Sequence, residues 1–181
     1  MNKIECLTAL KNMKNGKSPG IDGFTEEFYK FFWNDLGTFL IKSFNYSFEM
    51  KTLSISQTQG LITCIPKEGK SKIHLKNWRP IALLNVDMKI ASAALSNRIK
   101  QIPKEIISET QQGFLKGRYI GECTRLIFDL IEKAEEEEED ILGLLLLLDF
   151  EKVFDTLEWS FMNKALQFFG FGPDFCNWVK T

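Results

Sequence analysis

The stretch Leu144-Leu145-Leu146-Leu147-Leu148-Asp149-Phe150 places a carboxylate directly after a run of apolar residues. A short apolar run of this kind is typical of a buried strand, so we predict a strand over 141–148. Asp149 would then stand at the carboxyl end of the strand, where it could hold a divalent metal ion for phosphoryl transfer, with the backbone carbonyl of Phe150 as a further ligand. The alternative is that Asp149 caps the helix that follows, which is the more frequent role of such a residue.

The composition favours a globular protein of one domain, with room for a second, partial lobe. The chain has 181 residues, of which 44% are hydrophobic and 16 are Phe. Charge is divided unevenly along it. Residues 1–120 carry 18 Lys and Arg against 10 Asp and Glu, a net of +8, whereas residues 121–181 carry 5 against 14, a net of -9. A basic first part suggests a polyanionic partner, and the alternative is a chance division enlarged by the Glu135–Glu139 run.

Cysteine and histidine content excludes two classes of site. Cys6, Cys64, Cys123 and Cys176 are not spaced as metal ligands, and His74 is the only histidine. A zinc site and a histidine-based hydrolase triad are therefore not expected. No secretory signal opens the chain and no apolar stretch reaches membrane-spanning length, so we expect an intracellular protein with free thiols, no membrane association and no disulfide-linked partner.

Hydrophobic periodicity predicts a helix-rich α+β chain. The expected helices cover 3–14, 88–101, 122–134 and 156–169, with two more between 24 and 50 that break near 34–37. The expected strands cover 61–65 and 81–84 besides 141–148. The aromatic residues from Phe24 to Phe48 have helical spacing, and we expect them in the core.

A basic loop joins the first two predicted strands. Its charged residues are Lys67, Lys70, Lys72, Lys76 and Arg79 against the single acid Glu68. We predict that this loop binds a triphosphate, with the planar guanidinium of Arg79 as the donor and Pro80 fixing the backbone after it. The alternative is a solvated loop.

Two glycine-containing segments are candidates for contact with nucleic acid. In the segment Gly113 to Arg118, the glycines would let a nucleic-acid strand approach the backbone, while Phe114 and Arg118 would stack on it or contact it. The alternative is a turn before the next helix, with Phe114 in the core. Lys17 to Gly23 has the same two interpretations, as a phosphate contact or as a turn.

Five segments, in this order, resemble the reverse transcriptase of non-LTR (LINE-type) retrotransposons. They are Lys-Asn-Gly-Lys-Ser-Pro-Gly-Ile-Asp-Gly at 14–23, Leu-Ile-Thr-Cys-Ile-Pro-Lys at 61–67, Asn-Trp-Arg-Pro-Ile-Ala-Leu-Leu-Asn at 77–85, Gln112-Gly113-Phe114 with Gly117-Arg118, and Leu-Asp-Phe-Glu-Lys-Val-Phe-Asp at 148–155.

The resemblance implies a right-hand polymerase, of which this chain is the fingers lobe and an incomplete palm containing only its first strand and helix. Residues 1–60 would form an N-terminal helical extension of the fingers, 61–139 the fingers and 140–181 the start of the palm. It implies an RNA-directed DNA polymerase that uses Mg²⁺ or Mn²⁺, an RNA template, a DNA primer and dNTP, and that works in the cytoplasm and nucleus.

The resemblance also implies residue roles. Asp149 and the carbonyl of Phe150 would bind the metal, and Asp149 would be the catalytic carboxylate. Lys67, Arg79 and Phe154 would bind the nucleotide, with Phe154 excluding a ribose 2′-hydroxyl. The template would lie along Gly113, Phe114, Gly117 and Arg118.

The sequence departs from the family pattern at several places. Val153 stands where Ala is usual, which would crowd the nucleotide site, and Cys123 stands where Asn is common. The second metal-binding motif, Tyr-Ala-Asp-Asp, and the thumb are missing from the 181 residues. We therefore expect this chain alone to be inactive, as a fragment of a longer polymerase. The alternatives are a non-catalytic nucleic-acid-binding module or a decayed retroelement remnant.

Overall fold

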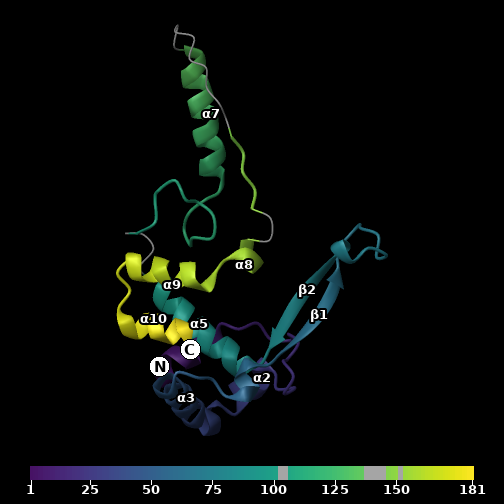
Figure 1. Ribbon diagram of the computed structural model, residues 1–181, viewed down its shortest axis with the longest axis vertical. Coiled ribbons are helices and arrows are strands. Elements are labelled where there is room, and N and C mark those ends of the chain that lie inside the picture. Colours follow the sequence, from purple (N-terminus) through teal and green to yellow (C-terminus); the bar gives the residue numbers. More distant parts are fainter. Residues whose placement is uncertain (102–105, 137–145, 151–152) are drawn as a thin grey trace. The chain divides into compact units, whose positions relative to one another are not determined.

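The computed structural model describes residues 1–101, 106–136, 146–150 and 153–181. The chain packs as two compact units (Figure 1). The first contains Met1–Lys100 together with Leu166–Thr181, and the second contains Gln101–Ala165.

The first unit is built mainly from helices. They are α1 (Lys3–Lys11), α2 (Glu26–Phe31), α3 (Trp33–Met50), α4 (Ile55–Thr58), α5 (Val86–Ile99) and α10 (Pro173–Lys180), with a short 3-10 helix at Leu75–Asn77. Its core comes from α1, α3 and α5, which bury Leu10, Phe44 and Ile90 together. The ring of Trp178 stacks on that of Phe48 at 4.4 Å, which attaches α10 to α3.

Two side-chain arrangements fix α1. Asn2 and Glu5 form a reciprocal capping box at its start, which satisfies backbone N–H groups that have no partner within the helix. The carboxylate of Glu5 also accepts two hydrogen bonds, of 2.9 and 2.8 Å, from the guanidinium of Arg98 on α5. The pair joins two helices whose sequences are far apart.

The helical pattern between residues 24 and 50 divides earlier than predicted. The break is at Phe32, between α2 and α3, and not near 34–37. Gly37 lies inside α3, where a Cβ atom would approach the ring of Trp33 to 2.9 Å. The lack of a side chain at Gly37 allows close packing against Trp33 within a continuous helix, so Gly37 does not end the helix.

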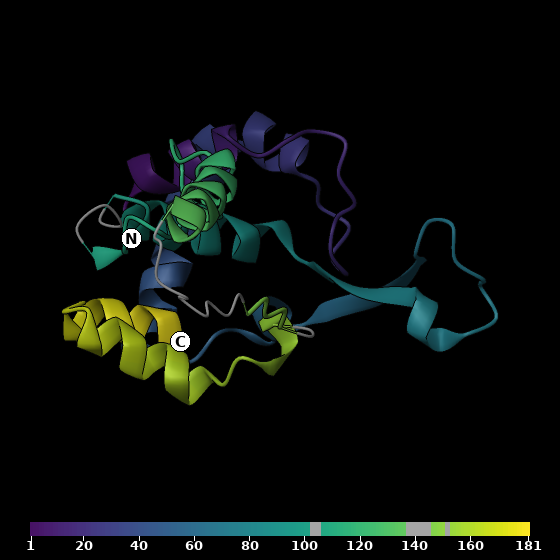
Figure 2. The same ribbon diagram turned by 90° about the horizontal axis from the view of Figure 1, so that it is seen from above.

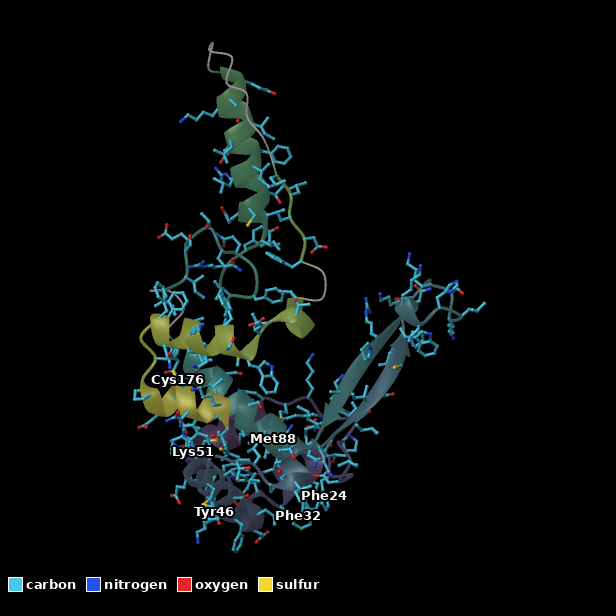
Figure 3. The ribbon with its side chains drawn as sticks, viewed as in Figure 1. Phe24, Phe32, Tyr46, Lys51, Met88 and Cys176 are labelled. Carbon is cyan, nitrogen blue, oxygen red and sulfur yellow. The ribbon has the colours of Figure 1, made fainter. Side chains whose placement is uncertain are left out.

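The aromatic residues of this region are only partly core, so that prediction is partly wrong. Trp33 and Phe44 are buried, but Phe31, Phe39 and Tyr46 are exposed. Figure 3 shows Phe24 and Phe32 beside each other at the surface of this unit, and the ring of Phe28 stands between them at 4.4 and 5.0 Å. The helices present more apolar faces than this unit covers.

A two-stranded antiparallel ribbon extends from the helices of the first unit (Figures 1 and 2). Strand β1 (Gly60–Pro66) pairs with β2 (Trp78–Leu84), from Gly60 opposite Leu84 at the base to Pro66 opposite Trp78 at the far end. Both predicted strands are confirmed, although β2 begins before 81. Pro80 is accommodated inside β2 because each strand of a two-stranded ribbon has an unpaired edge.

The second unit contains α7 (Gly121–Glu136) and α8 (Val153–Thr156), and α9 (Trp159–Phe168) begins in it. The predicted helices over 122–134 and 156–169 are therefore confirmed, the second as α9, which begins at Trp159 after the short α8. Of the predicted strand over 141–148, residues 141–145 lie outside the described part. Leu146 to Leu148 have no regular secondary structure and are exposed, so the predicted buried strand is wrong at these three residues. A strand needs a hydrogen-bonded neighbour, and among the described residues these three have none.

Among the described residues, no helix combines the length and the apolar character needed to cross a membrane. All four cysteines lie in the described part of the chain and are free thiols.

Candidate nucleotide and template site

The loop at the far end of the ribbon is folded by its own hydrogen bonds. The backbone N–H of Lys67 donates to the carbonyl of Asn77 at 2.7 Å, which closes the loop where the strands end. Within it, the side chain of Asn77 donates to the carbonyl of Ser71 at 2.7 Å and the indole N–H of Trp78 to that of Lys72 at 2.9 Å. The basic loop therefore has a defined conformation of its own.

Lys67 and Arg79 lie together at this end of the ribbon, since Arg79 is opposite Ile65 and next to the Pro66–Trp78 pair. The ammonium of Lys67 donates to the carbonyl of Lys76 at 2.9 Å and is exposed, so it keeps further N–H donors for an anion. The guanidinium of Arg79 is exposed and has no hydrogen-bond or ion-pair partner among the described residues.

A second loop, 17–23, is fixed against the base of the ribbon. Asn85, which follows β2 and is 1% exposed, donates from Nδ2 to the carbonyl of Ser56 at 2.8 Å. Its Oδ1 accepts from the N–H of Asp22 at 3.3 Å. The ammonium of Lys89 donates to the carbonyl of Ser18 at 3.3 Å. Asn85 is the last residue of the 77–85 segment, and no local sequence pattern indicates this contact.

Lys17 itself is exposed in that loop, with no partner among the described residues. Asp87 of α5 lies close to Asp22. Burial is the main cause that raises the pKa of the Asp87 carboxyl, and the negative charge of Asp22 raises it further. Hydrogen bonds from Met88 and Gln57 oppose the shift. Hydrogen bonds from Gly23 to Gly20 and from Asp22 to Asn85 support the turn interpretation of Lys17 to Gly23, and the phosphate contact of Lys17 stays a prediction.

The segment 107–118 in the second unit is a loop closed by Arg118. Nη1 of Arg118 donates to the carbonyls of Ser108 and Gln111, and Nη2 donates to that of Ile107 at 3.2 Å. Phe114 is 100% exposed, so the alternative that placed it in the core is wrong. Its backbone φ is 63°, a left-handed conformation that is uncommon for a residue other than glycine.

Asp149 and Phe150 are exposed in the second unit, and Phe154 lies in α8. No cluster of three or more His, Cys, Asp or Glu side chains within the described ranges could hold a metal ion. Asp149 is one carboxylate, and two Mg²⁺ ions need several. The described residues therefore do not by themselves complete a two-metal site.

The predicted site residues divide between the two units. Lys67 and Arg79 belong to the first, and Asp149, Phe150 and the template segment belong to the second. The structure brings Lys67 and Arg79 together, and it brings Gly113, Phe114, Gly117 and Arg118 together.

Comparison with known proteins gives the family. A family model described as reverse transcriptase (RNA-dependent DNA polymerase) matches residues 65–181. The chain belongs to the reverse transcriptase family. Members of this family generally use Mg²⁺ or Mn²⁺ and bind a nucleic-acid template and primer.

Two relatives come from transposable elements. The chain is 36% identical, over 98% of its length, to the Transposon TX1 uncharacterized 149 kDa protein of Xenopus laevis, of which it spans 13%. It is 25% identical, over 87% of its length, to the Putative 115 kDa protein in type-1 retrotransposable element R1DM of Drosophila melanogaster, of which it spans 15%. The resemblance to non-LTR retrotransposon reverse transcriptases is confirmed, and this reverse transcriptase chain spans a small part of those relatives.

Proposed function

We propose that this chain supplies the fingers and the start of the palm of an RNA-directed DNA polymerase of a non-LTR retrotransposon. In the proposal, residues 1–60 extend the fingers, 61–139 form them and 140–181 begin the palm. The whole protein would copy an RNA template from a DNA primer with dNTP, inside the cell, in the cytoplasm and nucleus.

The end of the ribbon carries the nucleotide-binding part of the proposal. The guanidinium of Arg79 has no hydrogen-bond or ion-pair partner among the described residues, and Lys67 lies beside Arg79 on a folded loop. A planar guanidinium matches the oxygens of a triphosphate in two-point contact, and an ammonium adds a point charge. Phe154 would act on the sugar of the same nucleotide.

Asp149 and the carbonyl of Phe150 carry the metal part. When bound, Mg²⁺ or Mn²⁺ would activate the attacking hydroxyl and stabilise the leaving pyrophosphate. Because Asp149 is a single carboxylate, the remaining ligands would come from elsewhere in a longer protein. We therefore expect the 181-residue chain by itself to show no primer extension.

Primer extension on an RNA template tests the proposal. A longer retrotransposon protein that contains this segment should extend the primer with Mg²⁺, and Asp149→Asn should abolish extension while leaving template binding intact. Extension that survives Asp149→Asn would contradict the assignment of the metal site.

A binding titration of the 181-residue chain with an RNA–DNA template–primer, repeated at increasing salt, separates the rival functions. Phosphate contacts make affinity fall steeply with salt. Salt-dependent binding by the chain, together with an inactive longer protein, would support a non-catalytic binding module, and absence of binding would support a decayed remnant.

A further inference from the structure

The guanidinium of Arg118 faces the inside of the loop 107–118. Arg118 gives three hydrogen bonds to carbonyls at the beginning of the loop, those of Ile107, Ser108 and Gln111. Each carbonyl presents its negative end to the guanidinium, and the planar group can serve several acceptors at once. The side chain that sequence alone assigns to the template is therefore occupied in holding the loop together.

The remaining bonds of the loop support the same closure. The N–H of Arg118 donates to the carbonyl of Leu115 at 3.3 Å, across a turn in which Gly117 has a φ of 87°. The side chain of Gln112 donates to the carbonyl of Glu109 at 2.8 Å. These contacts are all local, so Arg118 is the residue that connects the end of the loop to its start.

Phe114 stands between the two ends with its ring fully in solvent. Its left-handed backbone, φ 63°, is strained for a residue with a Cβ atom, and such a conformation persists only where the surrounding structure determines it. An exposed aromatic ring on a fixed backbone is the arrangement that stacks on an unpaired base.

We propose that Arg118 is a positioning residue that holds Phe114 in place to stack on a base of a single-stranded RNA template, and that its guanidinium does not contact a phosphate. The inference rests on the proposed function and deepens it, because it assigns different roles to two residues predicted to bind the template. Lys116, exposed in the same turn and without a partner among the described residues, is a matched cation for comparison.

The test is fluorescence anisotropy of a labelled single-stranded RNA with the 181-residue chain, over a salt series. Phe114→Ala and Arg118→Ala should each weaken binding by roughly 5- to 150-fold, the range measured for one base–aromatic stack. The double variant should bind RNA with the same affinity as the single variant that binds less tightly, since both changes remove the same contact.

The salt series distinguishes positioning from phosphate contact. A lost phosphate contact on a single strand flattens the plot of log affinity against log salt by about 0.7. Arg118→Ala should leave this slope unchanged. Arg118→Lys keeps the charge without the planar fork, so it should bind RNA as weakly as Arg118→Ala. A flattened slope in Arg118→Ala, additive effects in the double variant or full binding by Arg118→Lys would each overturn the inference.

Lys116→Ala provides the reference for removal of a cation from the same turn. It should leave intact the coupling between Phe114 and Arg118, so that Phe114→Ala has the same effect with or without Lys116. If Lys116→Ala instead abolished the effect of Phe114→Ala, Arg118 would not be the residue that positions the ring.

A measurement without RNA keeps the two proposals separate. Chymotrypsin cleaves after exposed aromatic residues, and the fixed backbone at Phe114 should resist it. Arg118→Ala should accelerate cleavage at Phe114, identified by mass spectrometry, and leave cleavage at exposed Phe31 unchanged. Equal rates of cleavage at Phe114 in Arg118→Ala and in the unaltered chain would overturn the positioning role of Arg118, even if the chain binds RNA. Faster cleavage together with no binding of RNA by the unaltered chain would instead count against the proposed function.

Discussion

Gly20 lies directly against Asn85, 65 positions later in the chain. A Cβ atom on Gly20 would overlap the side-chain oxygen of Asn85 and come within 2.7 Å of its Cα. That oxygen accepts the N–H of Asp22, while the amide nitrogen of the same side chain reaches the carbonyl of Ser56. A glycine is needed here for close approach of two backbones, and not for an unusual φ.

Gly20→Ala should therefore destabilise the chain. Neither the loop nor the buried Asn85 can move without breaking hydrogen bonds, and overpacking of this kind costs about 1–3 kcal/mol of the free energy of unfolding. Urea denaturation followed by circular dichroism measures it. Gly113→Ala is the control, because its Cβ would have only an ordinary contact at 4.0 Å. Equal denaturation midpoints for the two variants would contradict the close approach.

The pair of Glu5 and Arg98 should make stability depend on pH. The hydrogen bonds from Arg98 hold the pKa of the Glu5 carboxyl below its usual 4.5, against the smaller opposing effect of burial. Because the pKa is lower in the folded chain, the stabilisation is present above about pH 4.5 and is lost as the pH falls through the folded value. Both side chains are about one-third exposed, so the contribution is about 0.2–1 kcal/mol.

Urea midpoints of the unaltered chain and of Glu5→Gln, measured from pH 7 to pH 3, check this expectation. Gln preserves the capping box, so the variant isolates the charge. The difference between the two should shrink below pH 4.5. Exposed Glu49, which has no partner among the described residues, gives the control Glu49→Gln. A difference that stayed constant down to pH 3 would rule out the carboxylate as its source.

Arg79→Ala in an active, longer protein should raise the apparent KM for dNTP. A charge-assisted hydrogen bond of this kind contributes about 1.5–3 kcal/mol, or roughly ten- to hundred-fold in kcat/KM. Steady-state primer extension at varied dNTP measures the change. Template–primer affinity should hardly alter, and Lys70→Ala and Lys72→Ala should have smaller effects because solvated point charges are screened. Weaker template binding with unchanged dNTP dependence would reassign the basic loop to the nucleic acid.

The isolated chain should self-associate. Leu147 is 79% exposed and Ile62 on β1 is 69% exposed, and large apolar side chains left in solvent favour association. Light scattering on a size-exclusion column should show a mass that rises with concentration. Leu147→Glu should reduce the rise. Asn34→Glu, which adds the same charge at an exposed polar site, should not. A concentration-independent monomer would show that these side chains are covered in solution.

The local parts of the fold follow from sequence, and the parts that depend on distant contacts do not. Periodicity and turn residues predict α1, α5, α7 and the ribbon, since each rests on neighbouring residues. The contact of Gly20 with Asn85 joins segments 65 positions apart, and no local pattern contains it. A glycine inside an otherwise helical pattern predicts a break near Gly37, whereas the packing of Trp33 against it keeps α3 whole.

The candidate site divides in the same way. Residue type predicts an exposed cation at Arg79, and the structure places one there. The sequence assigns Arg118 to the template, but its guanidinium faces three carbonyls of its own loop. Gly117 and the short spacing from Gln111 to Arg118 are the sequence signals of a tight loop, although neither identifies the acceptors.

A small tilt at the base of the β1–β2 ribbon produces a larger displacement at its far end. Seven paired residues at about 3.4 Å each give it a length of about 24 Å, so a tilt of about 10° at the base would displace the far end by about 4 Å. That displacement exceeds the length of a hydrogen bond. Alignment of Lys67 and Arg79 with any ligand is therefore set at the opposite end, where Leu84 leads into Asn85. Gly20 touches neither cation. A substitution at Gly20 that tilts the base of the ribbon would nevertheless displace Lys67 and Arg79 from their ligand.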